Sequence, residues 1–134
     1  MGRLTLFLPK YFLDTYALME YVAGNRNYLP YFSSNSGDQV STSILNLMEL
    51  YFHILRDSGE NIADDSYAQF KQFDLPLTDD DVKSAMQLRL RLKARRLDLS
   101  YTDAIGYSIA QRIGAKFLTG DLAFKNLPDV EFVR

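Results

Sequence analysis

Short apolar runs alternate with amphipathic segments along most of the chain. The strand-like runs cover residues 11–13, a short run that begins at Val40, and residues 75–77, 115–118 and 130–133. Helical spacing of apolar positions covers residues 15–23, 27–34, 44–55, 67–73, 78–95 and 100–114. An acidic turn is predicted at 57–65, and Pro76 restricts its run to a sheet edge or end. Strands that alternate with helices predict a parallel α/β sheet.

Composition places the chain among ordinary globular proteins. Its 134 residues are 47% hydrophobic and 24% charged, which suits one domain with a buried core and argues against disorder. No internal repeat, low-complexity tract or linker interrupts it, so we expect a single domain over 1–134. The formal net charge of −2 does not indicate a nucleic-acid binder, so such a function would need a local basic patch.

The residue inventory excludes several kinds of site. There is no cysteine, which excludes disulfides, thiolate zinc sites and cysteine nucleophiles, and His53 is the only histidine. Carboxylates and hydroxyls must therefore carry any hydrolytic chemistry. No run reaches the roughly 18 apolar residues of a membrane span, and residues 1–9 do not form a signal peptide. We therefore expect a cytoplasmic protein with no membrane contact.

Two acidic residues follow predicted strands. Asp14 comes at the end of the run 11–13, and Asp121 comes just after the run 115–118. The carboxyl ends of parallel strands line the ligand crevice of an open α/β sheet, so both positions favour function. The structural alternatives are a helix cap for Asp14 and an ordinary turn residue for Asp121.

Two further acids lie within predicted helices. Glu49 interrupts an apolar stripe, and a buried carboxylate needs a cation, a proton or strong hydrogen bonds. Asp103 lies three residues after Ser100, close to Gly106, which allows close approach of a backbone or a ligand. Glu49 facing water and Asp103 completing a capping box are the alternatives. None of these structural alternatives explains the four acids as a set.

The four acids lie in motifs that resemble those of the PIN-domain family. They are Phe12-Leu13-Asp14-Thr15, Asn46-Leu47-Met48-Glu49-Leu50, Leu99-Ser100-Tyr101-Thr102-Asp103-Ala104 and Gly114-Ala115-Lys116-Phe117-Leu118-Thr119-Gly120-Asp121. They cover the chain from about residue 11 onward in the family's order. The chain is most similar to the small prokaryotic VapC-type toxins. The resemblance implies a three-layer α/β/α fold with a short parallel sheet of about four to five strands. Residues 1–10 extend beyond the family pattern.

The resemblance also implies an activity. Asp14, Glu49, Asp103 and Asp121 would be both catalytic and metal-ligating, gathered around Mg²⁺ or Mn²⁺, and such hard ions prefer carboxylate oxygens. A metal-activated water would cleave an RNA phosphodiester bond, leaving 5′-phosphate and 3′-hydroxyl ends. Thr15 and Thr119 are candidate hydroxyls supporting the ligands. The family further implies a small antitoxin partner, a type II toxin–antitoxin pair and a homodimer.

The segment 82–97 holds six basic residues and no acid. Arg89, Lys93 and Arg96 fall on one helical stripe, which makes them candidates for RNA-backbone contact. A solvated basic face is the alternative. The aromatic residues Tyr28, Tyr31 and Phe32 either pack a short helix onto the core or form a docking surface for another chain.

An alternative function is a PIN-like module that binds RNA or protein without cutting. The presence of all four acids argues against it. Phospho-acceptor and Asp-x-Asp phosphatase sites are excluded, because Thr15 and Tyr16 follow Asp14 where those sites need a further acid.

Overall fold

The computed structural model describes residues 10–32 and 39–134. In chain order, the helices and strands of these residues, with η marking a 3-10 helix, are β1 (Tyr11–Leu13), α2 (Thr15–Val22), η1 (Arg26–Phe32), β2 (Val40–Ser41), α3 (Ile44–Ser58), α4 (Glu60–Lys71), α5 (Asp79–Ala94), α6 (Tyr101–Ile113), β3 (Lys116–Thr119), η2 (Leu122–Phe124) and β4 (Val130–Phe132). None of the helices in the described ranges is long and apolar enough to cross a membrane.

The strands form a parallel sheet of order β2-β1-β3-β4. Phe12 pairs with Phe117 and Leu13 pairs with Leu118 in the β1–β3 register. The chain runs outward from β1 to β2 on one side, whereas β3 and β4 lie on the other. The crevice at this reversal of strand order, between the carboxyl ends of β1 and β3, is where open α/β sheets bind ligands.

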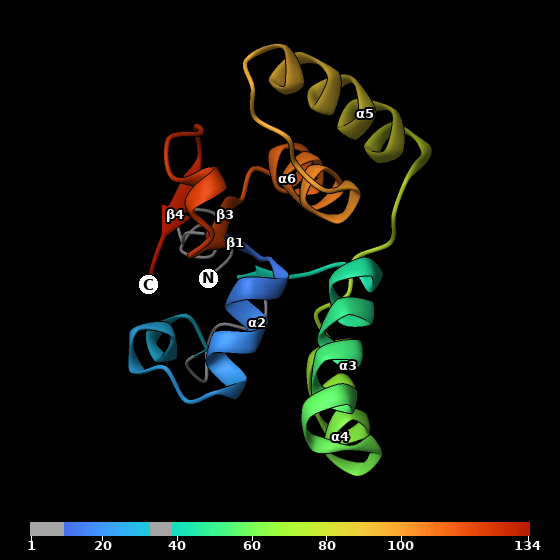
Figure 1. Cartoon of the computed structure of the whole chain (residues 1–134), viewed down its shortest axis with the longest axis vertical. Coiled ribbons are helices and arrows are strands. Elements are labelled where there is room, and N and C mark those ends of the chain that lie inside the picture. The colour runs from blue at the N-terminus through green and yellow to red at the C-terminus, as the bar shows by residue number, and fades with distance from the viewer. Residues whose placement is uncertain (1–9, 33–38) are drawn as a thin grey trace, which may run out of the picture.

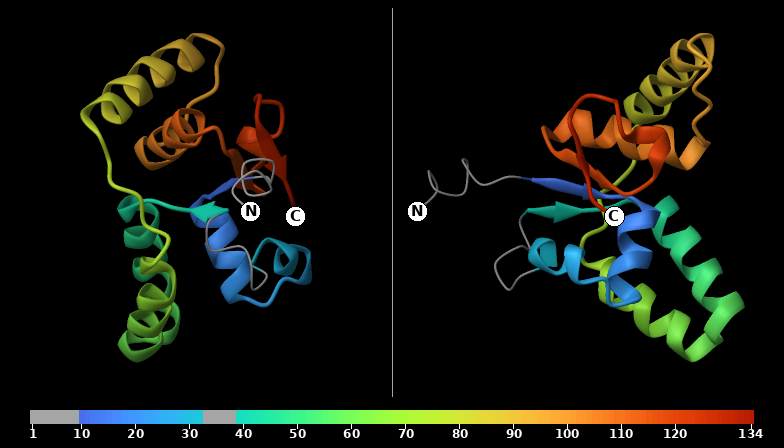
Figure 2. Two further views of the ribbon diagram at one scale, coloured as in Figure 1. Left: turned by 180° about the vertical axis from the view of Figure 1, so that it is seen from behind. Right: turned by 60° about the vertical axis from the view of Figure 1, so that its left-hand side comes forward.

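Both faces of the sheet are buried, which explains the apolar strand sequences. Phe12 and Phe117 belong to the core cluster that includes α6, and Leu13 and Leu118 belong to the one that includes α2 and α3. Successive side chains of a strand point to opposite faces, so one short run serves both layers. Figures 1 and 2 show α5 and α6 on one side of the sheet and α2, α3 and α4 on the other. The predicted three-layer α/β/α fold is confirmed.

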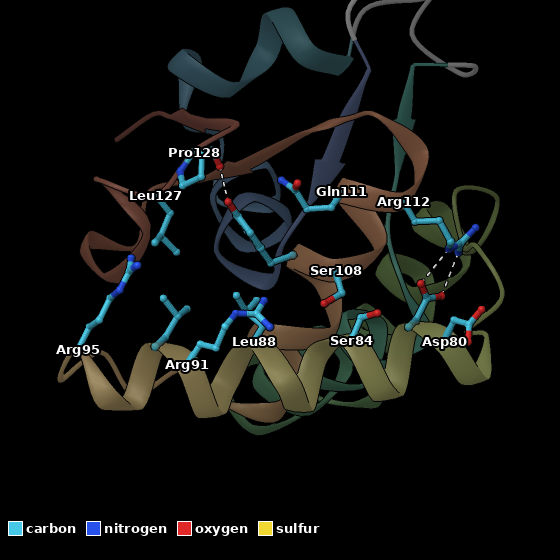
Figure 3. Close-up of a pocket in the computed structure, with 13 residues that line it drawn as sticks. Asp80, Ser84, Leu88, Arg91, Arg95, Ser108, Gln111, Arg112, Leu127 and Pro128 are labelled. Carbon is cyan, nitrogen blue, oxygen red and sulfur yellow. Dashed lines mark hydrogen bonds and ion pairs between the residues drawn. The ribbon is translucent and has the colours of Figure 1, made fainter.

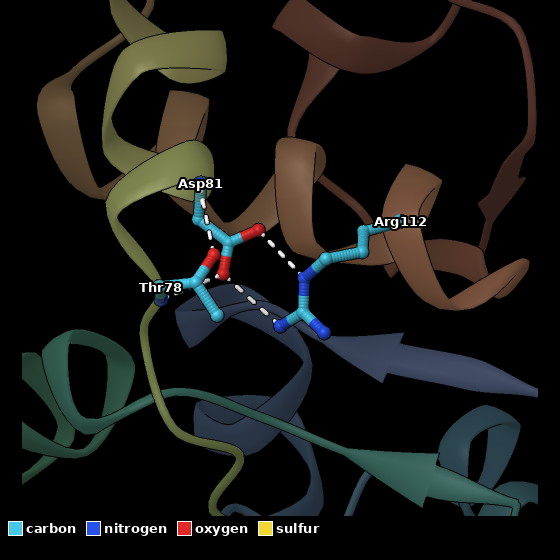
Figure 4. Close-up of polar contacts among 3 residues, drawn as sticks. All are labelled: Thr78, Asp81 and Arg112. Atoms are coloured by element: carbon cyan, nitrogen blue, oxygen red, sulfur yellow. Dashed lines mark hydrogen bonds and ion pairs between the residues drawn. The ribbon is translucent and has the colours of Figure 1, made fainter.

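An ion pair between a buried carboxylate and a partly exposed arginine fixes the start of α5 against the end of α6. Thr78 and Asp81 form a capping box, in which each side chain accepts a hydrogen bond from the backbone N–H of the other residue. The Asp81 carboxylate also accepts two hydrogen bonds from Arg112, from Nε at 2.8 Å and from Nη2 at 3.0 Å (Figure 4). Burial alone would raise the pKa of Asp81, but the hydrogen bonds from Arg112 and Thr78 outweigh it, so the pKa is lowered. The pair therefore joins two helices that also pack through apolar residues.

Two predicted elements are wrong. The predicted acidic turn at 57–65 is helical except at Gly59 (φ 92°), because α3 continues to Ser58 and α4 begins at Glu60. The predicted strand at 75–77 is absent from the described structure; pairing there is limited to a bridge between Thr42 and Asp74. Pro76 lacks the N–H that a continuing ladder needs.

The aromatic residues of η1 pack on the core, as the first of the two interpretations predicted. Tyr28 is fully buried, and its hydroxyl donates to the Val133 carbonyl oxygen at 2.5 Å. Tyr31 is half-buried and donates to Glu131 at 2.7 Å. η1 therefore holds the C-terminal strand in place. The predicted extension over residues 1–10 lies outside the described residues except for Lys10.

Gly106 allows α6 to lie close to the sheet. A Cβ at this position would stand 2.8 Å from Cε1 of Phe12 and 3.3 Å from Cε1 of Phe117, two buried rings stacked 5.9 Å apart. We expect Gly106→Ala to lower the free energy of unfolding by about 1–3 kcal/mol, because overpacking outweighs the gain in helix propensity. Urea denaturation measures the change. Gln87→Ala, at an exposed position of α5, is the control, and greater stability of Gly106→Ala would contradict the prediction.

Candidate active site

A cavity of about 390 Å³ lies at the carboxyl-terminal edge of the sheet, and all four predicted acids line it. Asp14 directly follows β1, and Asp121 follows β3 by two residues. Glu49 comes from the second turn of α3, and Asp103 comes from the first turn of α6. Four segments that are distant in sequence therefore bring carboxylates to one crevice.

Asp14 is the most deeply buried of these acids, at 2% exposure. One of its oxygens accepts the N–H of Ala17 at 2.8 Å, so the residue also caps α2. Burial raises the pKa of Asp14 to about 7, against the hydrogen bonds from Thr119 and Ala17 that lower it. The nearby charges of Asp103 and Asp121 raise this pKa further. The carboxyl group is thus poorly solvated and faces like charges.

Asp103 is half-buried and, like Asp14, lies near other carboxylates. Its pKa is raised chiefly by burial, and the Asp121 and Glu49 carboxylates raise it further. The Ser100 side chain opposes this shift and caps the helix by accepting the N–H of Asp103 at 3.1 Å. Ser100 therefore caps α6, which is one half of the predicted capping box, and this cap is compatible with Asp103 lining the cavity.

A chain of hydrogen bonds orients Glu49. The Thr15 hydroxyl donates to Oε1 of Glu49 at 2.5 Å and accepts from Nδ2 of Asn46 at 3.1 Å. The Ser43 hydroxyl in turn donates to Oδ1 of Asn46 at 2.7 Å. Thr119 plays a similar part for two of the other acids, because its hydroxyl bonds Asp14 and accepts the backbone N–H of Asp121 at 3.0 Å. The two predicted supporting hydroxyls thus contact three of the acids.

Asn46 and Ser43 were not predicted as site residues. The signal was present, because Asn46 lies one turn before Glu49 on the same helical face. The cavity also contains residues outside the predicted site, namely Tyr16, Met19, Glu20, His53 and Ser100. The sequence favours a packed or surface role for His53; in the structure it lies one turn after Glu49 and reaches the cavity wall.

Thr15 offers a direct test of this support. Thr15→Val keeps the shape of the side chain but removes both of its hydrogen bonds, so Glu49 loses its orientation. Glu49 is expected from the sequence to be a metal ligand, and losing a group that orients a ligand usually costs about 10–100-fold in metal affinity, so we expect Mn²⁺ affinity to fall by this factor. Isothermal titration calorimetry measures it, with Thr15→Ser as the control that retains the hydroxyl. Equal affinity in the Val and Ser variants would contradict the prediction.

Comparison with known proteins identifies the family. The sequence pattern of the PIN domain matches residues 11–130, which is most of the chain. The chain belongs to the PIN-domain family. No curated protein sequence matches this PIN domain at a significant level.

Solved structures share the fold of this PIN domain. The VapC20 toxin of Mycobacterium tuberculosis, described as cleaving the sarcin-ricin loop, superposes with a TM-score of 0.74 at 21% identity, over 93% of this chain and 99% of the toxin. DNA-bound VapBC of Salmonella typhimurium gives 0.75 at 17%, over 94% and 98%. FitAcB of Neisseria gonorrhoeae gives 0.72 at 19%, over 92% and 96%. At these low identities, the TM-scores show a common fold and nothing more.

The donor set of this PIN domain suits a hard divalent cation. Carboxylate oxygens are the ligands that Mg²⁺ and Mn²⁺ prefer, and a cation would offset the repulsion among the acids, which adds to burial in raising the pKa of Asp14 and of Asp103. Within 10–32 and 39–134, no three Asp, Glu or His side chains are grouped as a ready-made metal site. The acids therefore share a cavity without forming a finished coordination sphere.

The predicted basic stripe is only partly helical. Arg89 and Lys93 belong to α5, but the helix ends at Ala94 and Arg96 has a left-handed backbone (φ 65°), so the stripe does not extend to Arg96. The Arg89 guanidinium donates to the Leu99 carbonyl oxygen at 2.7 Å and lies 4.3 Å from the Tyr101 ring. Arg89 thus positions the segment that leads into Ser100 and Asp103.

Proposed function

We propose that this PIN domain is a metal-dependent endoribonuclease. The observation that carries the proposal is that Asp14, Glu49, Asp103 and Asp121 all line one cavity at the sheet's strand-order reversal. The VapC20 toxin, which shares the fold, cleaves the sarcin-ricin loop, and this likeness supports RNA as the substrate class here. RNA as substrate is consistent with the cytoplasmic location expected from the sequence.

The four carboxylates would hold Mg²⁺ or Mn²⁺. Asp14 and Asp103 would bind the ion directly, and Glu49 and Asp121 would bind it directly or through water. When bound, such an ion lowers the pKa of a coordinated water and neutralises charge on the scissile phosphate. The chain's own contribution is orientation: Thr15 fixes one Glu49 oxygen, and Thr119 holds Asp14 and the backbone of Asp121 together. In α5, Lys93 remains a candidate for backbone contact, as does Arg96 beyond it.

The decisive experiment is RNA cleavage with controlled metal. We expect cleavage of RNA that EDTA abolishes and that added Mn²⁺ or Mg²⁺ restores, with 5′-phosphate and 3′-hydroxyl ends on the products. Cleavage that persists in EDTA would reject the metal assignment. Binding of RNA without metal uptake or cleavage would instead support the non-catalytic module.

We also propose that the protein is the toxin of a type II toxin–antitoxin pair. Solved VapBC and FitAB assemblies share the fold, which supports a small protein partner for this chain. Induced expression of the chain alone should stop bacterial growth, and co-expression with a short open reading frame, where one adjoins its gene, should restore growth. Continued growth on induction of the active protein would contradict this role.

A homodimer is the third part of the proposal, and α3 offers a surface for it. Ile44, Met48, Phe52 and Leu55 recur along α3 with 36%, 53%, 57% and 41% exposure. These residues form an apolar stripe beside Glu49, and burying it against a second copy would remove this area from water. Light scattering should give the mass of two chains for the wild type and of one chain for Met48→Glu/Phe52→Glu. A monomeric wild type would contradict the dimer.

A further inference from the structure

A second and larger cavity, of about 700 Å³, lies between α5, α6 and the segment that precedes β4 (Figure 3). It shares no lining residue with the acidic cavity. Its volume falls within the roughly 300–1,000 Å³ of small-molecule sites, which combine apolar walls with a few placed polar groups. The charged and hydrogen-bonding groups that line it identify the chemistry that it suits.

Apolar side chains form two walls of this cavity. Leu88 and Leu92 come from α5, and Leu127 and Pro128 come from the segment before β4. The Tyr107 hydroxyl donates to the Pro128 carbonyl oxygen and so ties that segment to α6. The space between these walls suits a flat apolar body.

Hydrogen-bonding groups lie beside the apolar walls, toward the end of the cavity at Asp80 (Figure 3). Ser84 and Ser108 face each other across the two helices in Figure 3, and neither hydroxyl bonds another group in the described chain. Ser108 is only 8% exposed, so its hydroxyl has little access to solvent outside the cavity. Gln111 donates through Nε2 to Asp129 at 3.2 Å, which leaves its amide oxygen as an acceptor. A purely apolar ligand would leave these groups unused.

The charges are divided between the two ends of the cavity. Arg91 and Arg95 lie one turn apart near the end of α5, and in the described residues neither guanidinium has a hydrogen bond or ion pair. Arg112, by contrast, is held by Asp81 at the other end, where Asp80 adds a negative charge. An anionic group is therefore attracted to the Arg91–Arg95 end and repelled from the end at Asp80.

We propose that this cavity binds a nucleoside 5′-monophosphate unit. The phosphate lies at Arg91 and Arg95, where charge-assisted hydrogen bonds are available, and the base lies between the apolar walls with its polar edge toward Ser84 and Ser108. The proposal does not depend on RNA cleavage. The unit is either a free nucleotide or one nucleotide of a bound RNA strand, since both present the same chemistry.

Calorimetric titration of the full chain in EDTA tests the proposal, because chelation excludes metal-dependent phosphate binding at the acidic cavity. The probes are 5′-AMP, 5′-GMP, 5′-CMP and 5′-UMP. We expect saturable one-to-one binding of at least one of them, weakened at least about tenfold in Arg91→Ala/Arg95→Ala, which loses two charged partners. Lys83→Ala/Lys116→Ala, which removes two charges from exposed positions outside the cavity, should bind like the wild type.

Three results would overturn the proposal: no binding of any of the four nucleotides, equal weakening in the two double variants, or binding of inorganic phosphate or decanoate as tight as that of the nucleotide. Thermal melting checks that both double variants are folded. Competition with a mixed-sequence RNA octamer in EDTA then distinguishes a free nucleotide from a nucleotide of bound RNA as the natural ligand. Displacement of the nucleotide supports a nucleotide of bound RNA, and its retention supports a free nucleotide. Failure of the endoribonuclease proposal would not affect any of these readouts.

Discussion

Asp14→Asn is expected to lose at least about 100-fold in metal-dependent RNA cleavage while keeping the fold. Losing a residue that merely supports a metal ligand costs about 10–100-fold, and Asp14 is itself proposed as a ligand. Asparagine still caps α2, because its amide oxygen can accept the Ala17 N–H that Asp14 accepts at 2.8 Å. The variant therefore removes a charge from the cavity and little else. Initial rates with a labelled RNA at several Mn²⁺ concentrations measure the loss.

Two companion variants make this result interpretable. Asp103→Asn should show a loss of the same order, because Asp103 lines the same cavity from another helix. Asp65→Asn, at an exposed position of α4, should cleave like the wild type. Full activity in both Asp14→Asn and Asp103→Asn would reject the proposed ligand set. Weak Mn²⁺ binding by calorimetry in these two variants, with normal binding in Asp65→Asn, would link the lost activity to the metal.

The elements that position the acids could be predicted because their signals are local. Asp14 and Asp121 follow short apolar runs that are buried on both sides, and such runs are typical of parallel strands. Thr78 and Ser100 begin helices with side chains that accept backbone N–H groups, as their sequence positions suggest. The convergence of the four acids depended on the family resemblance, because local patterns do not determine which strand ends are neighbours.

Other features could not be predicted, because they depend on contacts between distant residues. Asp81 and Arg112 are 31 residues apart, and neither sequence neighbourhood indicates the pairing. The three consecutive acids at 79–81 look alike in the sequence, yet only Asp81 is buried and paired. The sequence indicates close approach at Gly106 without identifying the partner, and the partner is the stacked ring pair Phe12 and Phe117. The cavity between α5 and α6 likewise arises only once the helices pack.

Ionisation of Asp14 should make the metal-free protein less stable as the pH rises. Its pKa in the folded protein is about 7, against an ordinary 3.8, because the carboxyl is buried and faces Asp103 and Asp121. A carboxyl whose pKa is raised by folding contributes most to stability below its unfolded pKa, and this contribution is lost as pH rises through the folded pKa. The loss between pH 4 and pH 8 is about 4 kcal/mol, since each pKa unit corresponds to about 1.4 kcal/mol.

Urea denaturation in EDTA across this pH range measures the effect, and Asp14→Asn isolates it. The variant has no ionising group at this position, so its free energy of unfolding should fall less steeply with pH and exceed that of the wild type at pH 8. Asp103 shifts in the same direction and accounts for part of the slope that remains. Parallel pH curves for the two proteins would show that Asp14 titrates normally. Added Mn²⁺ should stabilise the wild type more at pH 8 than at pH 5.5, because carboxylates must lose their protons to bind the ion.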